Sequence, residues 1–298
     1  MHRFPAQARG LWDGIELEGA ERMYLTRFVS GFDPTHLRIV DYLTRYPFST
    51  AAAIEGAFAS LAAKDVLVRN DDVYAFTDHG MQVAHTWLRR VGALLDNVAT
   101  EVLSASDAET LLQFDHRILD ALRQSKGAYP MPIFAHRSRG LQPPFDPPRL
   151  WHHWQLAWSM IACDEDAQEH VRVAEGVAPL EWFFRRQLWF VHQRPWRARV
   201  RGMSLHALAN RYAPVEEPAC RQAWAALMAG GHGDGAYDAP RLSAKGLDMH
   251  EAAEKASDDL FLSCWPRFGA EEIDALEALV HQVNETCEGV LGDTAGSA

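Results

Sequence analysis

The side chains best suited to binding a charged partner form an arginine-rich run in the second half of the chain. Residues Trp182–Val215 include no Asp or Glu, and the run carries seven arginines: Arg185, Arg186, Arg194, Arg197, Arg199, Arg201 and Arg211. A guanidinium group can donate two parallel hydrogen bonds to a phosphate, so a basic stripe of this kind is typical of DNA-binding proteins. The alternative is that these arginines pair with carboxylates elsewhere in the chain, whose net charge is −11.

The ten tryptophans are a second group of interest. Trp151, Trp154 and Trp158 share a helical face, and Trp182, Trp189 and Trp196 follow at seven-residue intervals. Packing in a hydrophobic core is the simpler interpretation. The alternative is an aromatic pocket for a flat, apolar small molecule, with these candidate lining residues: Trp154, Trp158, Trp189 and His192.

No group of residues predicts catalysis, a metal site or a cofactor. His152 and His153 are adjacent, so on a helix they point to different sides. The Asp164–Asp166 triplet is interpreted as a solvated acidic face. Asp115 precedes a histidine, but the chain has no G-x-S-x-G nucleophile motif. The four cysteines form no C-x-x-C pair, which indicates buried thiols in a reducing compartment.

The composition is that of a soluble globular protein. The chain has 298 residues, of which 48% are hydrophobic and 23% charged, and the length suggests two domains. No apolar run reaches the ~18–20 residues of a membrane helix, and no secretory signal is evident, so we expect no membrane contact and a cytoplasmic location.

Prolines mark the boundary between the domains. Six of the fifteen lie between Pro130 and Pro148, where they disfavour helix and predict a connector. The expected division is residues 1–127, a linker at 128–148, a second unit at 149–288 and a flexible tail at 289–298.

Both halves show the same order of predicted elements: helices, a β-hairpin, a long helix and a last helix. The segments Phe76–Gly80 and Leu242–Gly246 each close a hairpin and open a long helix. The sequence therefore predicts a mostly α protein with short β-hairpins, built from two copies of one unit.

Helices followed by a hairpin are the arrangement of a winged helix-turn-helix. The stretch Tyr237–Val283 resembles the C-terminal part of MarR-type regulators, where a wing strand ends in a Leu-Thr-x-x-Gly-like segment and leads into two long helices. Residues 74–114 follow the same pattern. The resemblance implies a tandem winged-helix DNA-binding protein, and because MarR-like proteins respond to phenolic ligands, it also implies a small aromatic effector.

The second unit is the one expected to contact double-stranded DNA. The segment between Pro47 and Val66 is too short for a turn and two full helices, which suggests a shortened helix-turn-helix in the first unit. In the second unit, Arg221 and Gln222 fall at the start of the predicted recognition helix, where base contacts are made. The candidate phosphate contacts are Arg197, Arg199, Arg201, Arg211 and, on the wing, Arg241.

Two functions from different classes follow. The first is a transcriptional regulator that is ligand-responsive, acting as a monomeric pseudo-dimer or as a homodimer. The second is a winged-helix module that binds a protein or a small ligand without reading a DNA sequence, which the acidic net charge favours.

Overall fold

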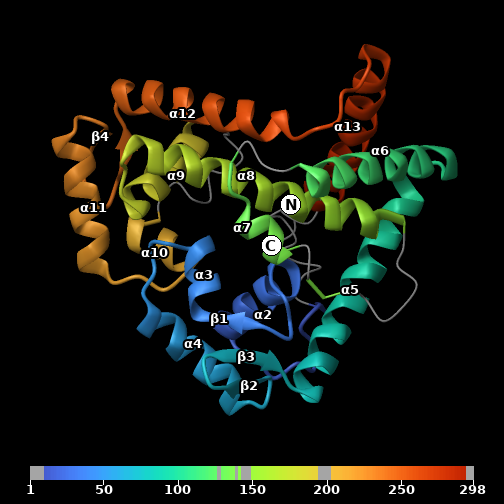
Figure 1. The fold of residues 1–298 in the computed structure, drawn as a ribbon, viewed down its shortest axis with the longest axis horizontal. Coiled ribbons are helices and arrows are strands. Elements are labelled where there is room, and N and C mark those ends of the chain that lie inside the picture. Colours follow the sequence, from blue (N-terminus) through green and yellow to red (C-terminus); the bar gives the residue numbers. More distant parts are fainter. Residues whose placement is uncertain (1–9, 126–128, 138–139, 142–148, 194–202, 293–298) are drawn as a thin grey trace.

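The computed structural model of the chain describes residues 10–125, 129–137, 140–141, 149–193 and 203–292. Within these ranges the protein is mostly helical and has two small antiparallel sheets, as the sequence predicts. Figure 1 shows the long helix α8 (Arg149–Glu175) crossing the middle of the molecule. Helices α2, α3 and α4 and the strands of the first half lie below it, and α12 (Ala244–Ser263) runs above it.

The first half contains a three-stranded sheet and the helices around it. Its elements are α2 (Gly19–Gly31), β1 (Leu37–Arg38), α3 (Ile39–Arg45), α4 (Ala51–Ala63), β2 (Leu67–Asn70), β3 (Val73–Phe76), α5 (Asp78–Val102) and α6 (Ala105–Gln124). The strand order is β1-β3-β2, with Leu67 opposite Phe76. Helix α4 begins where Thr50 Oγ1 accepts the N–H of Ala53, and it buries Ile54, Phe58 and Leu61 on one face.

The expected linker, residues 128–148, contains a short helix, α7 (Pro132–Arg137). Pro132 occupies its first position, where a missing N–H costs no helical hydrogen bond. Ile133 and Phe134 are buried, and α7 packs along α8. This part of the connector is therefore an integral part of the packed structure.

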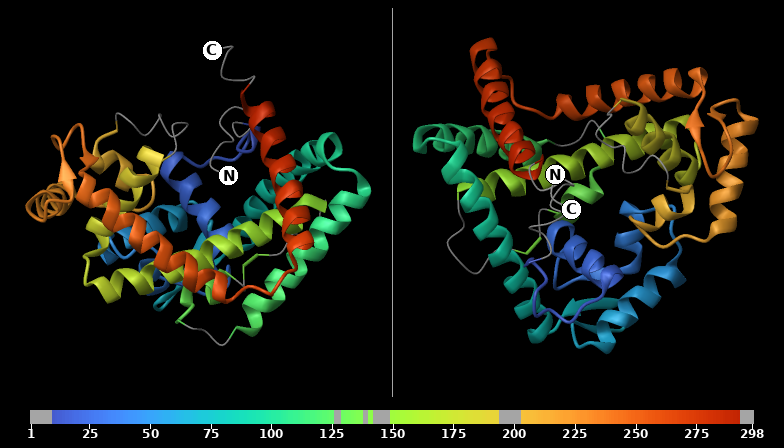
Figure 2. Two further views of the ribbon diagram at one scale, coloured as in Figure 1. Left: turned by 90° about the horizontal axis from the view of Figure 1, so that it is seen from above. Right: turned by 180° about the vertical axis from the view of Figure 1, so that it is seen from behind.

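The second half repeats the order of the first around a two-stranded sheet. After α8 come α9 (Pro179–Gln193), α10 (Leu205–Asn210), α11 (Glu217–Ala229), β4 (Gly233–Asp234), β5 (Arg241–Leu242), α12 and α13 (Ala270–Gly292). The serines before α10 and α12 cap them: Ser204 Oγ accepts the N–H of Ala207, and Ser243 Oγ that of Gly246. Both views in Figure 2 place α11 at one outer edge and α13 at the opposite side, where it packs on α5 and α6.

Individual hydrogen bonds recur in the two halves at residue numbers that differ by a constant amount, so that Val66 corresponds to His232 and Thr77 to Ser243. The N–H of Thr77 donates to the carbonyl of Val66 (3.2 Å), and the N–H of Ser243 donates to that of His232 (2.9 Å). Helices α4 and α11 each have 13 residues, and their first residues are separated by the same offset. The two halves therefore share local geometry as well as element order.

The shortened helix-turn-helix expected in the first half is wrong. The helix that precedes α4 lies before Pro47, not after it, because α3 ends at Arg45. Helices α3 and α10 have 7 and 6 residues, so the two halves match in this respect too.

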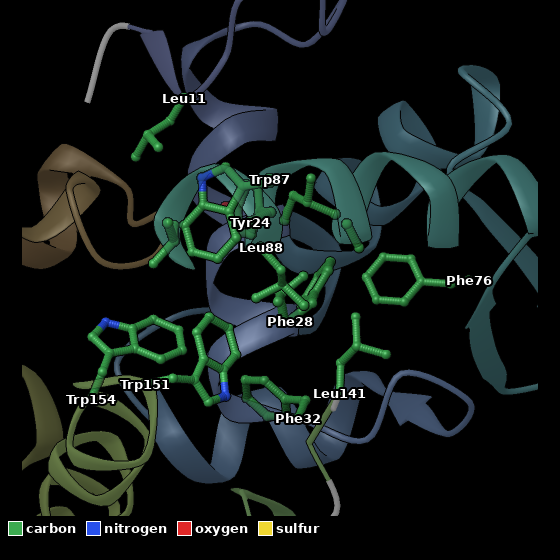
Figure 3. Packing of buried hydrophobic residues seen from close by; sticks show 14 of the residues in the cluster. Leu11, Tyr24, Phe28, Phe32, Phe76, Trp87, Leu88, Leu141, Trp151 and Trp154 are labelled. Carbon is green, nitrogen blue, oxygen red and sulfur yellow. The ribbon is translucent and has the colours of Figure 1, made fainter. Parts of the chain in front are cut away.

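The hydrophobic side chains form separate cores, of which the largest surrounds α2 and α5. Phe28, Phe32 and Trp87 lie in it, and α8 contributes Trp151 and Trp154, as Figure 3 shows. A second core joins α9, α10 and α11 around Phe184 and Trp224. A third lies between α6, α7 and α8.

The turns that join α3 to α4 and α10 to α11 contact each other. Ser49 Oγ donates to the carbonyl of Pro214 (2.6 Å), and Arg27 Nη2 donates to that of Arg211 (2.6 Å). The ring of Phe48 packs on Phe183 with centroids 4.6 Å apart. These contacts hold the two halves together, and Ser49 and Pro214 lie at nearly equivalent points of the repeat.

Candidate functional site

Helix α11 and its β-hairpin were the expected DNA-reading face. Arg221 and Gln222 are exposed on the first two turns of α11, which agrees with the position predicted for them. However, Arg221 Nη2 pairs with Glu217 at 2.5 Å, and its guanidinium lies 4.3 Å from the ring centroid of Tyr237. This pairing partly offsets the charge of Arg221, which was expected to contact a base.

The other arginines of the expected interface have varied surroundings. Arg241, on β5, pairs with Asp234 of β4 through a 2.9 Å contact. Arg211 is exposed at the end of α10. Arg197, Arg199 and Arg201 lie outside the described residues.

The charge of the helix and hairpin is the same in both halves. Residues 50–76 and residues 216–242 each contain four carboxylates and two Lys or Arg residues, a net charge of −2. In the first half, Arg69 of β2 pairs with Glu55 of α4 at 2.9 Å. Both faces therefore have a sign opposite to that of a phosphate-binding surface.

Two arginines of the acid-free run are buried or half-buried and pair with carboxylates of the same chain. Arg185 is 1% exposed, pairs with Glu175 at 2.6 Å and stacks on Trp182. Arg186 pairs with Asp164 at 3.1 Å. For these two, the alternative that the arginines pair with carboxylates of the same chain is realised.

The four residues proposed to line an aromatic pocket are not brought together. Trp154 and Trp158 belong to the first core, where the ring of Trp154 packs near Trp87. Trp189 packs against the second core and against His250, at a centroid distance of 5.4 Å. His192 lines a cavity to which the other three do not contribute.

That cavity has a volume of about 910 Å³ and lies between α9, α10 and the β4–β5 hairpin. Its wall is largely aliphatic, with Leu188, Val191, Leu205, Leu208, Leu242 and Leu247. Polar groups lie at its rim: His192, Asp234, Asp238 and Arg241. An apolar wall with a few polar groups, in this range of volume, is the usual form of a small-molecule site. Sequence reasoning missed it, because its walls come from segments that are far apart in the chain.

The acidic triplet on α8 is not a solvated face, so that expectation is wrong. Each carboxylate contacts a different element: Asp164 pairs with Arg186 of α9, and Glu165 with Arg45 of α3 (2.8 Å). Asp166 is 2% exposed and accepts the N–H groups of Ile133 and Phe134 in α7, at 3.0 and 2.9 Å. Burial raises the pKa of Asp166 to about 7 although these two donors lower it, and burial raises that of Asp164 to about 6. The three carboxylates therefore bind α8 to α9, α3 and α7.

The remaining candidate residues, Asp115 with its neighbouring histidines and the cysteines, make contacts that stabilise the fold. His153 Nδ1 lies 3.2 Å from Asp115, so the partner of this carboxylate is not the adjacent His116. Cys163, Cys220 and Cys264 are buried thiols, as expected, and burial raises the pKa of Cys163. Among the described residues, no group of three His, Cys, Asp or Glu side chains could hold a metal ion.

Comparison with known proteins gives no further guide to the site. The chain matches no protein-family model, no curated protein and no solved structure. In the described part of the chain, no helix has the length and apolar character needed to cross a membrane.

Proposed function

We propose that the chain consists of two winged-helix units in tandem and that it binds a small, largely apolar ligand without reading a DNA sequence. The repeated order of two helices, a hairpin and a long helix supports the first part. The hydrogen bonds that recur at equivalent positions of the two halves support it further, because they fix the entry into the hairpin and the start of the long helix in both.

The observation that carries the ligand-binding function is the cavity of about 910 Å³ beside the second hairpin. Burial of an apolar molecule against the partly exposed Val191 and Leu247, with the buried leucines behind them, supplies binding free energy in proportion to the area removed from water, at about 25 cal/mol per Å². The polar groups at the rim supply orientation. His192 is the residue of the expected effector pocket that remains in this proposal.

Two observations weigh against readout of DNA in two successive grooves. The net charge of −2 on each helix and hairpin repels phosphates instead of attracting them. In addition, the bond between Ser49 and Pro214 limits how far apart α4 and α11 can begin. At 3.8 Å between successive Cα atoms, the Cα atoms of Ala51 and Glu217, which begin the two helices, lie within about 26 Å of each other. This is less than the ~34 Å that separates the two half-sites bound by a dimeric regulator on DNA.

The test is saturable binding of N-phenyl-1-naphthylamine, a neutral dye that becomes fluorescent in apolar surroundings. Ala239 is exposed at the cavity rim, so Ala239→Trp fills the opening without removing a core side chain. We expect this variant to weaken dye binding at least tenfold.

The matched control is Val173→Trp, which adds the same side chain at a position on α8 that is 61% exposed. It should bind the dye as the unmodified protein does. Equal binding by both variants, or no saturable binding by the unmodified protein, would contradict the proposed function.

A DNA-binding regulator is the second candidate, because Arg221 and Gln222 are exposed at the start of α11. Fluorescence anisotropy with a labelled random duplex, from 20 to 300 mM salt, tests it. A regulator would bind with a steep salt dependence, and the sequences that it selects from a pool of random duplexes would change in Arg221→Ala and Gln222→Ala. For the proposed ligand-binding module, we expect no binding at physiological salt.

A further inference from the structure

A second cavity lies in the first half of the protein, away from the one described above. Its volume is about 770 Å³, it opens to solvent, and it is lined by the segment Gly14–Glu18, by Arg22 of α2, by the end of α4 and by the first turns of α5. Every residue that lines it belongs to the described part of the chain.

Three cationic side chains line this cavity: Arg22, Lys64 and Arg90. Lys64 Nζ is neutralised by Glu21, at 2.7 Å. The two arginines differ from it, because each donates to a backbone carbonyl. Arg22 Nε bonds to Leu17 O (2.5 Å) and Arg90 Nη1 to Leu11 O (2.9 Å). A carbonyl oxygen accepts a hydrogen bond but leaves the charge of the guanidinium in place.

The carboxylates near the cavity are not placed to cancel this charge. Glu21 is already engaged, since it accepts from Lys64, from Ser60 Oγ (2.7 Å) and from the N–H of Glu18 (2.8 Å). Glu16 and Glu18 line the cavity but are exposed, so water and salt screen them. Arg22 and Arg90 are half-buried, and their charges are screened less.

The rest of the wall is partly apolar. Ile15, Leu17, Val66 and Val83 line it, and Trp12 lies behind Arg22, whose guanidinium is 5.7 Å from the indole centroid. A ligand that fits both kinds of wall has an apolar body and one anionic group. Carboxylates and phosphates are the anions that a guanidinium binds best, because its two parallel N–H groups can donate to two oxygens of one anion.

We infer that this cavity binds an organic anion, a carboxylate or phosphate monoester with a short apolar chain, whose charged group lies between Arg22 and Arg90. The site is independent of the cavity in the second half. Its ligand differs in chemistry from the neutral apolar molecule proposed there.

Isothermal titration calorimetry with four probes tests the inference: octanoate, octyl phosphate, octanol and inorganic phosphate. We expect octanoate or octyl phosphate to bind at least tenfold more tightly than octanol, because octanol lacks the charge. Inorganic phosphate should bind at least tenfold more weakly than the better octyl anion, because it lacks the apolar chain. The stronger of the two octyl anions identifies the headgroup.

Arg90→Gln removes one of the two charges and should weaken binding of the octyl anion at least fivefold. The matched control is Arg89→Gln, which removes the same charge from an exposed neighbour on α5 that does not line the cavity. Gln82→Trp fills the cavity from an exposed position and keeps both arginines, so it should also weaken binding if the protein remains folded by circular dichroism.

Three results would overturn the inference. One is equal affinity for octanol and the octyl anions, which would assign the cavity to apolar ligands of any charge. Another is equal loss in Arg89→Gln and Arg90→Gln, which would indicate general attraction by the surface. The third is the absence of binding heat for both octyl anions up to 5 mM.

Discussion

Gly80 and Gly246 occupy the same place in the two halves of the protein, and neither position has room for a side chain. A Cβ atom at Gly80 would lie 2.0 Å from the carbonyl oxygen of Val66, and one at Gly246 would lie 2.1 Å from that of His232. Both glycines are buried in the first turn of a long helix, where the hairpin backbone crosses. The close approach explains why both segments end in glycine.

We therefore expect Gly80→Ala and Gly246→Ala each to lower the free energy of unfolding by about 1–3 kcal/mol, the usual cost of overpacking a core. Urea denaturation measures the change. Gly56→Ala is the control, because Gly56 lies on the exposed face of α4 with no atom within 4 Å of an added Cβ. There, alanine should stabilise by about 0.5–1 kcal/mol. A loss of stability in Gly56→Ala similar to that in the other two would contradict the explanation.

The buried carboxylate of Asp166 makes stability depend on pH. Burial raises its pKa in the folded protein to about 7, above the ordinary value of 3.8, so the folded state holds the proton more tightly. Its contribution to stability is complete below pH 3.8 and is lost as the pH rises through 7. The slope cannot exceed about 1.4 kcal/mol per pH unit for one proton.

Asp166→Asn removes this ionisation. Relative to the variant, the unmodified protein should lose stability between pH 5.0 and pH 7.5, as measured by urea denaturation at both values. The effects of Asp164 and His250, whose pKa values burial also shifts, are common to both proteins and cancel. A difference in stability that is the same at both pH values would show that Asp166 is ionised throughout.

The arginines of the acid-free run should differ in how much they contribute to the free energy of unfolding, according to whether they are buried or exposed. Arg185→Ala removes a side chain that is 1% exposed together with its contacts to Trp182 and Glu175, so we expect a loss of about 2–5 kcal/mol, the usual cost of removing a large buried side chain. Arg211→Ala removes an exposed side chain and should change stability by less than about 0.5 kcal/mol. Similar effects of the two changes on thermal unfolding would be inconsistent with this division.

Phe48 joins the two halves, because its ring packs against Phe183 and lies beside both the first and the second core. Phe48→Ala should cost about 1–3 kcal/mol, less than a fully buried phenylalanine, since the ring is half-buried. Differential scanning calorimetry should also show a broader transition, because the halves lose a shared contact. Phe190→Ala, at a half-buried position of α9 beside Trp189, should lower the melting temperature without broadening the transition.

The elements whose formation depends on residues close to one another in the sequence were predictable. The N-cap at Ser243, the apolar face of α4 and the hairpin with its turn at Asp71 follow from local hydrogen bonds and side-chain spacing. The constant offset between the halves was visible for the same reason, because a buried glycine and a capping residue recur where each hairpin leads into a helix.

The partners of the charged and aromatic side chains were decided only by the tertiary structure. The sequence shows an arginine at position 45 and an acidic triplet at 164–166, but not that Arg45 and Glu165 meet. It shows tryptophans at regular spacing, but not that Trp154 and Trp189 belong to different cores. Coulombic attraction and burial act between side chains that packing brings together, whatever their separation in sequence. For that reason the composition of each half was readable from the chain, whereas the pairing of Arg185 with Glu175 and the two cavities required the folded arrangement.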